Sequence, residues 1–95
     1  MGLGLIEQHR IVVRGGVDGV AFRVWVKNVA RSLQLMGHVR FVEPGVCEVL
    51  AQGNRFALRQ FVATCRRGPC EGVVESVTDE REPLEKHLFE FALYR

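Results

Sequence analysis

The apolar residues of the chain change their spacing from one segment to the next, and this predicts the order of its elements. The β-branched run at 11–13 predicts a strand over residues 7–14. From Phe22 onward, apolar residues recur every three or four positions, which is the spacing of one helix face: Phe22, Val26, Val29, Leu33 and Met36. Gly37, the next residue, is predicted to end this helix.

The middle of the chain predicts a hairpin and a second helix. Residues 38–43 and 46–52 have strand-like composition, and the turn dipeptide Pro44-Gly45 separates them. A second helix is predicted to begin after the N-cap residue Asn54 and to end before Gly68-Pro69. Its apolar face consists of Leu58, Phe61, Val62 and Cys65.

The last quarter of the chain predicts two further strands. Residues 72–78 are rich in valine and predict a fourth strand, whereas the charged residues 79–87 are interpreted as a loop. Phe89, Phe91 and Leu93 occupy alternate positions, which predicts a half-buried closing strand.

The order strand, helix, strand, strand, helix, strand, followed by the closing element, predicts one α+β domain over residues 1–95. The expected architecture is a ferredoxin-like βαββαβ sandwich, in which two helices cover one face of an antiparallel sheet. Residues 1–8 are expected to form a flexible N-terminal extension.

Composition restricts the class of protein. The chain has 95 residues, of which 47% are hydrophobic and 25% charged, as in soluble globular domains and unlike disordered segments. It has no apolar run of about 18 residues and no signal-peptide pattern, so we expect a cytoplasmic protein without membrane contact. The three cysteines cannot form a complete disulfide framework and are expected to be reduced thiols, although a local Cys65–Cys70 bond stays open.

The most informative segment is a glycine-rich loop between the first predicted strand and helix: Gly15, Gly16, Val17, Asp18, Gly19 and Val20. Unpaired backbone N–H groups and the helix dipole make such a position favourable for a phosphate-sized anion. Arg23 can add a two-pronged contact to phosphate oxygens. A plain tight turn beside a solvated arginine is the alternative interpretation.

Residues 17–23, Val-Asp-Gly-Val-Ala-Phe-Arg, resemble the loop of the acylphosphatase family, usually written Gly-x-Val-Gln-Gly-Val-x-Phe-Arg. Residues 37–41, followed by Gly45 and Gly53, are similar to the family's second motif, and the resemblance extends from about residue 9 to the final strand. It implies hydrolysis of the carboxyl–phosphate bond of small acyl phosphates, without a metal or organic cofactor. It also implies that residues 15–20 cradle the phosphoryl group and that Arg23 clamps it.

Four positions depart from the family pattern. Phe41 occupies the position of the asparagine that orients the attacking water, and a phenyl ring neither donates nor accepts a hydrogen bond. Asp18 replaces the usual glutamine, and a carboxylate beside an anion site opposes phosphate binding unless it points away or is paired. Gly16 stands where a basic residue is frequent, and His38 where an aromatic residue is usual.

Three functions follow as hypotheses. The first is a monomeric acylphosphatase-type hydrolase. The second is a binding module on the same fold, which holds inorganic phosphate, sulfate, a phosphate-bearing ligand or a partner protein without efficient hydrolysis. Acylphosphatase-like domains also occur within hydrogenase-maturation carbamoyl transferases, which are much larger than this chain.

The third hypothesis is an RNA-binding module that stacks bases on Phe89 and Phe91. The acidic residues around that strand disfavour the binding of a polyanion. No metal site is predicted, and the histidines are interpreted as surface or packing residues: His9, His38 and His87.

Overall fold

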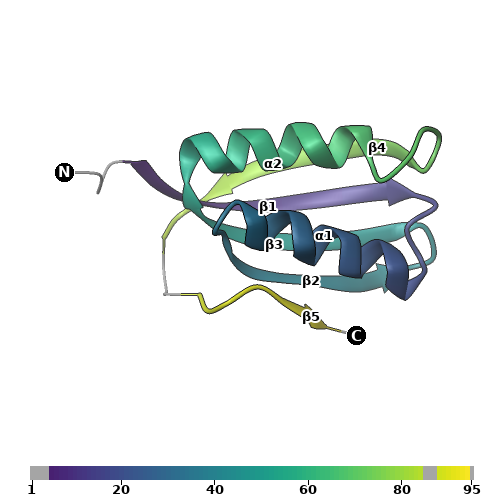
Figure 1. Ribbon diagram of the computed structural model, residues 1–95, viewed down its shortest axis with the longest axis horizontal. Coiled ribbons are helices and arrows are strands. Elements are labelled where there is room, and N and C mark those ends of the chain that lie inside the picture. Colours follow the sequence, from purple (N-terminus) through teal and green to yellow (C-terminus); the bar gives the residue numbers. More distant parts are fainter. Residues whose placement is uncertain (1–4, 85–87, 95) are drawn as a thin grey trace.

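Two helices lie on one face of a five-stranded sheet in the computed structural model, which describes residues 5–84 and 88–94 (Figure 1). The elements are β1 (Ile6–Gly15), α1 (Val20–Ser32), β2 (Met36–Glu43), β3 (Val46–Asn54), α2 (Arg55–Arg67), β4 (Val74–Glu82) and β5 (Ala92–Tyr94). The strand order is β4-β1-β3-β2-β5. The predicted ferredoxin-like sandwich is confirmed, but the sheet is mixed, because β5 pairs with β2 in parallel.

The core lies between the sheet and the two helices, as strand alternation and helical spacing predict. On the sheet side, Ile11 and Val13 of β1 and Val49 of β3 are fully buried. The predicted apolar face of α2 is buried throughout: Leu58, Phe61, Val62 and Cys65. The predicted boundaries of α2 are also confirmed, because the Asn54 side chain accepts a hydrogen bond from the Phe56 N–H at 2.8 Å.

The prediction that Gly37 ends the first helix is wrong. α1 ends at Ser32, and the chain reverses through Gln34, whose φ is 59°. Gly37 instead lies in β2 with a φ of 135°, and a Cβ atom there would overlap the carbonyl oxygen of Leu50 in β3. Helical spacing misleads at this point because β2 begins directly after a short reversal, so Met36 continues the apolar spacing without belonging to the helix.

Replacing Gly37 with alanine is therefore expected to lower the free energy of unfolding by about 3 kcal/mol or more, from backbone strain and overlap. Gly72→Ala is the matched control, because Gly72 also has a positive φ, of 87°, but open space where its Cβ would lie. The control should cost about 1 kcal/mol. Urea denaturation measures both, and equal losses would show that contact with β3 contributes nothing.

Charged residues extend β4 beyond its predicted end. Residues 79–82, interpreted as loop, continue the strand to Glu82 opposite Gln8 of β1. The reason is cross-strand pairing: Arg10 bonds to Glu82 at 2.7 Å, and His9 bonds to Asp79 at 2.6 Å. The predicted extension over 1–8 is also wrong for residues 6–8, which belong to β1, and residues 1–4 lie outside the described residues.

The closing strand is shorter than predicted, since β5 covers only Ala92–Tyr94. Phe91 is fully buried, whereas Phe89 is 79% exposed, so the two rings do not share an exposed face as base stacking would require. His87 lies outside the described residues.

Within the described ranges, no helix is long and apolar enough to cross a membrane. All three cysteines are free thiols, so Cys65 and Cys70 are not joined in this structure. Cys65 is buried in the core, and burial raises the pKa of its thiol to about 12.

Candidate functional site

Backbone hydrogen bonds anchor the start of the glycine-rich loop to neighbouring segments of the chain. The Gly15 N–H donates to the carbonyl oxygen of Gly45 at 3.0 Å, and the Gly16 N–H donates to that of Val73 at 2.7 Å. The Val17 N–H donates to the Gly15 carbonyl at 2.8 Å. The first three amides of the predicted 15–20 cradle are therefore engaged within the protein.

The following amides lie at the start of α1. Gly19 is the N-cap, α1 begins at Val20, and its first turn contains no acidic residue. Among the residues that the structure describes, no acceptor is found for four successive N–H groups, those of Asp18, Gly19, Val20 and Ala21. These donors and the helix dipole together make a site of positive potential.

Asp18 is turned to the β2–β3 hairpin by a specific hydrogen bond. Its Oδ1 accepts from the Gly45 N–H at 2.6 Å, while the Gly45 carbonyl accepts from Gly15. The loop and the hairpin turn are thus joined in both directions. The carboxylate is held by a backbone donor, which reduces its conflict with an anion at the neighbouring amides.

Arg23 lies in the first turn of α1, directly beside the loop. Its Nη1 donates to the Asp18 carbonyl oxygen at 3.2 Å. Its guanidinium carbon lies 6.0 Å from the centre of the Phe41 ring. The structure therefore brings three sequence-predicted residues, Asp18, Arg23 and Phe41, to one place although they come from different elements.

Phe41 is near the end of β2, where it pairs with Cys47 of β3. Arg40, its neighbour, bonds to Glu48 at 2.9 Å on the opposite face of the sheet. The side chain of Arg40 is therefore engaged with Glu48, away from Arg23.

Cys47 is a site residue that the sequence reasoning missed. It is fully buried beneath the loop, and its thiol donates to the Val17 carbonyl at 3.2 Å. Burial raises the pKa of this thiol, although the nearby Arg23 partly opposes the rise. The sequence gives no signal for it, because a two-residue turn at Pro44-Gly45 would place Glu48 opposite Phe41, and the register shift between Phe41 and Glu43 brings Cys47 there instead.

Comparison with known proteins adds three findings. The acylphosphatase family model matches residues 9–93. An acylphosphatase of Synechococcus sp. (strain CC9311) is 36% identical over 78 residues, which are 82% of this chain and 87% of that protein. The crystal structure of acylphosphatase from Bacillus subtilis superposes with a TM-score of 0.85 at 30% identity, covering 95% of this chain and 99% of that chain.

A likeness of fold alone extends to a much larger protein. Full-length HypF, crystallised in a phosphate- and nucleotide-bound form, matches with a TM-score of 0.82 at 22% identity. The match covers 95% of this chain but 12% of that one.

Proposed function

The chain belongs to the acylphosphatase family, and from this premise we propose that it hydrolyses the carboxyl–phosphate bond of small acyl phosphates. The observation that carries the proposal is the position of Arg23, bonded to the Asp18 carbonyl beside a run of N–H groups at the start of α1. An arginine and a helix N-terminus are the groups that hold a phosphoryl group in a fixed place.

Binding is proposed to use the amides of residues 18–21 and the guanidinium of Arg23. The amides donate hydrogen bonds to the phosphoryl oxygens, and the two-pronged guanidinium neutralises their charge. Both come from one chain, so the proposed site needs no residue from a second copy. Because these groups supply the countercharge, the proposal needs no metal or organic cofactor.

The reaction is an attack of water on phosphorus. A new P–O bond forms to the water oxygen, while the bond from phosphorus to the acyl oxygen breaks and its electron pair leaves with the carboxylate. The products are the carboxylate and inorganic phosphate, which retains both protons of the water at the moment of cleavage. Since a carboxylate is a weakly basic leaving group, the protein mainly needs to position the reactants and stabilise charge.

Phe41 bears on the rate of this step rather than on binding. Its ring lies beside Arg23 and offers no hydrogen bond to a water molecule. We therefore expect slow hydrolysis with ordinary phosphate binding. The contact between Phe41 and Arg23 also supports the second candidate function, a module that binds phosphate or sulfate without turnover.

Benzoyl phosphate hydrolysis and calorimetric titration with inorganic phosphate, each measured for the wild type and for Arg23→Ala, test the proposal. Hydrolysis that is lost in the variant supports the hydrolase. Phosphate binding to the wild type without any hydrolysis supports the binding module instead. Absence of both would overturn the assignment of the loop.

Asp18→Asn is expected to tighten inhibition by phosphate about threefold, because it removes a negative charge while keeping an acceptor for the Gly45 N–H. Asp18→Ala is the matched control, since it removes the same charge and the hydrogen bond as well, and should lower the free energy of unfolding by about 1 kcal/mol. The inhibition constant and urea denaturation separate the two effects. Unchanged inhibition in Asp18→Asn would place the anion away from this loop.

A further inference from the structure

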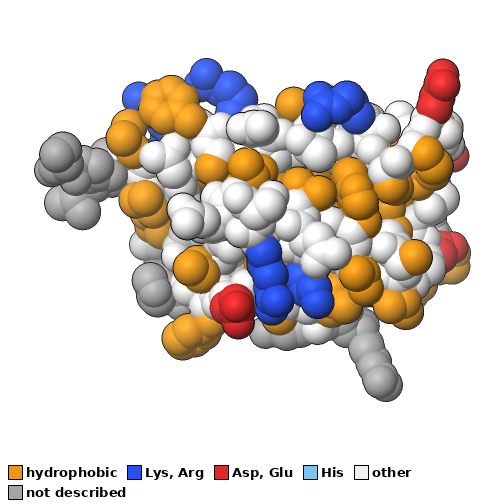
Figure 2. All heavy atoms as spheres, in the orientation of Figure 1, with side chains coloured by type: hydrophobic (Ala, Val, Ile, Leu, Met, Phe, Trp, Pro, Cys, Tyr) orange, Lys and Arg blue, Asp and Glu red, His pale blue; other side chains and the backbone are white. Residues whose placement is uncertain are grey.

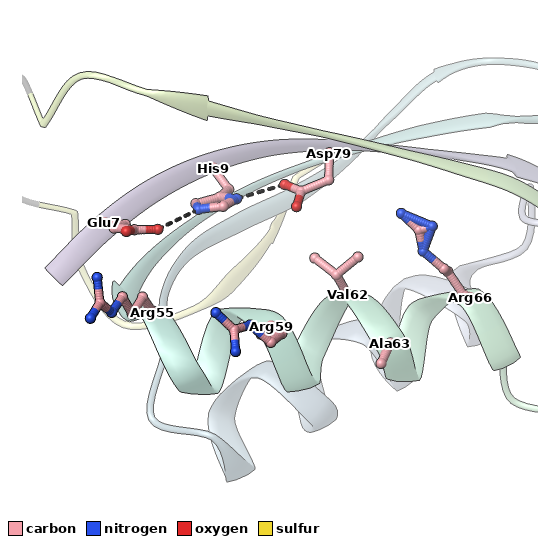
Figure 3. Close-up of a pocket in the computed structure, with 8 residues that line it drawn as sticks. All are labelled: Glu7, His9, Arg55, Arg59, Val62, Ala63, Arg66 and Asp79. Atoms are coloured by element: carbon pink, nitrogen blue, oxygen red, sulfur yellow. Dashed lines mark hydrogen bonds and ion pairs between the residues drawn. The ribbon is translucent and has the colours of Figure 1, made fainter. Parts of the chain in front are cut away.

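A groove of about 420 Å³ lies between α2 and the strands β1 and β4, and the proposed function does not use it (Figure 3). Its volume falls within the range of small-molecule sites. His9 on its sheet wall precedes Gly15 by six residues of extended strand, about 20 Å. The groove is therefore separate from the loop at residues 15–20, and we refer to it as the α2 groove.

The sheet wall of the α2 groove is a row of three titratable side chains. His9 Nδ1 lies 2.6 Å from Asp79 Oδ1, and its Nε2 lies 2.9 Å from Glu7 Oε1. Burial works to lower the pKa of His9, but the hydrogen bonds to the two carboxylates outweigh it and the pKa is raised. With a carboxylate at each ring nitrogen, the ring is best satisfied as an imidazolium that donates twice. Arg81, outside the groove, forms an ion pair with the other Glu7 oxygen at 3.5 Å.

The helix wall is formed by three arginines of one flank of α2: Arg55, Arg59 and Arg66 (Figure 3). α2 has no acidic residue, and none of the three forms an ion pair within the part of the chain that the structure describes. The Phe56 ring lies 5.3 Å from the Arg55 guanidinium carbon and 5.7 Å from that of Arg59. Cation–π contact thus holds two guanidiniums together at one end of the groove. Figure 2 shows Lys and Arg side chains gathered over both ends of α2, along the upper edge of the view.

The charges that line the α2 groove do not balance. Three guanidiniums and the imidazolium face two carboxylates, which leaves two positive charges. A phosphate monoester is close to a dianion at neutral pH and accepts two-pronged hydrogen bonds from arginine. Val62 and Ala63 add apolar surface between the arginines, and the carboxylates of Glu7 and Asp79 can accept hydrogen bonds from hydroxyl groups.

We propose that the α2 groove is a second ligand site, and that it binds a phosphate monoester whose organic part carries hydroxyl groups. The phosphate is held by Arg55 and Arg59, where the guanidiniums cluster. The organic part lies along Val62 and Ala63, and its hydroxyl groups donate hydrogen bonds to the carboxylates of the sheet wall. This assignment is independent of the proposed hydrolysis, because none of these residues belongs to the loop or to the Arg23 site.

Calorimetric titration of the full chain with ribose 5-phosphate tests the proposal, and Arg23→Ala serves as the background in which the proposed loop site is weakened. We expect saturable binding to Arg23→Ala, no binding of ribose, and weaker binding of inorganic phosphate. No binding to this background would overturn the proposal. Inorganic phosphate that binds as tightly as ribose 5-phosphate would overturn the assignment of the organic part.

A pair of arginine variants within the same background locates the ligand. Arg59→Gln should weaken ribose 5-phosphate binding about tenfold, because it removes one charge-assisted contact. Arg67→Gln removes the same charge from the same helix, but Arg67 bonds to the Thr64 hydroxyl and does not line the groove, so binding should change less than about twofold. Equal weakening by both variants would mean general attraction to α2 and would overturn the site. In the chain that retains Arg23, Arg59→Gln should leave benzoyl phosphate hydrolysis unchanged.

Discussion

Phe41→Asn is expected to raise kcat for benzoyl phosphate about a hundredfold, with KM nearly unchanged. The reason is the place of residue 41: it pairs with Cys47 beneath the loop, and its ring lies 6.0 Å from the Arg23 guanidinium carbon. An asparagine there supplies one acceptor and two donors, which can hold a water against the phosphorus. Losing one such positioned hydrogen bond in an electrostatic site costs about 10²–10³ in rate, so gaining it should return a comparable factor.

The matched control is Phe41→Leu, which also removes the ring but adds no polar group. It should not raise kcat, so that a gain in the asparagine variant alone assigns the effect to hydrogen bonding. Inhibition by inorganic phosphate should be similar in all three proteins, because our proposal assigns the phosphoryl group to the loop amides and Arg23. A wild type that is already as fast as Phe41→Asn would show that another group orients the water.

Local signals were enough to predict α2 and the position of the loop. The hydrogen bond from Phe56 to the Asn54 side chain and the buried face of α2 depend on residues that are close in sequence. The glycine-rich loop is likewise a local feature, and its place between β1 and α1 follows from the change of period that the sequence shows. Residue spacing could therefore locate both without knowledge of the rest of the fold.

Features that depend on distant partners could not be predicted in the same way. The extension of β4 rests on charge pairing with β1, including the contact of His9 with Asp79, 70 residues further along. Strand propensity alone assigns such a charged segment to a loop, because it depends only on the residues of the segment and not on the charged partners that the neighbouring strand supplies. The orientation of Asp18 is of the same kind: it is set by the N–H of Gly45, 27 residues away.

Arg23→Ala is expected to lower kcat/KM for benzoyl phosphate about a thousandfold and to weaken inhibition by phosphate. The guanidinium is held at the loop by the Asp18 carbonyl, at 3.2 Å, where our proposal places it against the phosphoryl oxygens. Its loss removes binding and transition-state stabilisation together, since a two-pronged arginine contact acts on the phosphoryl oxygens throughout the reaction. Arg23→Lys keeps the positive charge but loses the two-pronged hydrogen bonding of the guanidinium, so its kcat/KM should lie between those of Arg23→Ala and the wild type.

Lys27→Ala is the matched control, because it removes one positive charge from α1 a single turn further on. It should leave kcat/KM within about threefold of the wild type, since a charge one turn beyond the first acts only through screened attraction. Urea denaturation of both variants checks that each is folded under the assay conditions. The comparison with Phe41→Asn then separates the two roles: position 41 should change kcat alone, whereas position 23 should change both turnover and phosphate binding. Equal losses in Arg23→Ala and Lys27→Ala would mean that the helix contributes only general attraction, and that the phosphoryl group is not clamped at the loop.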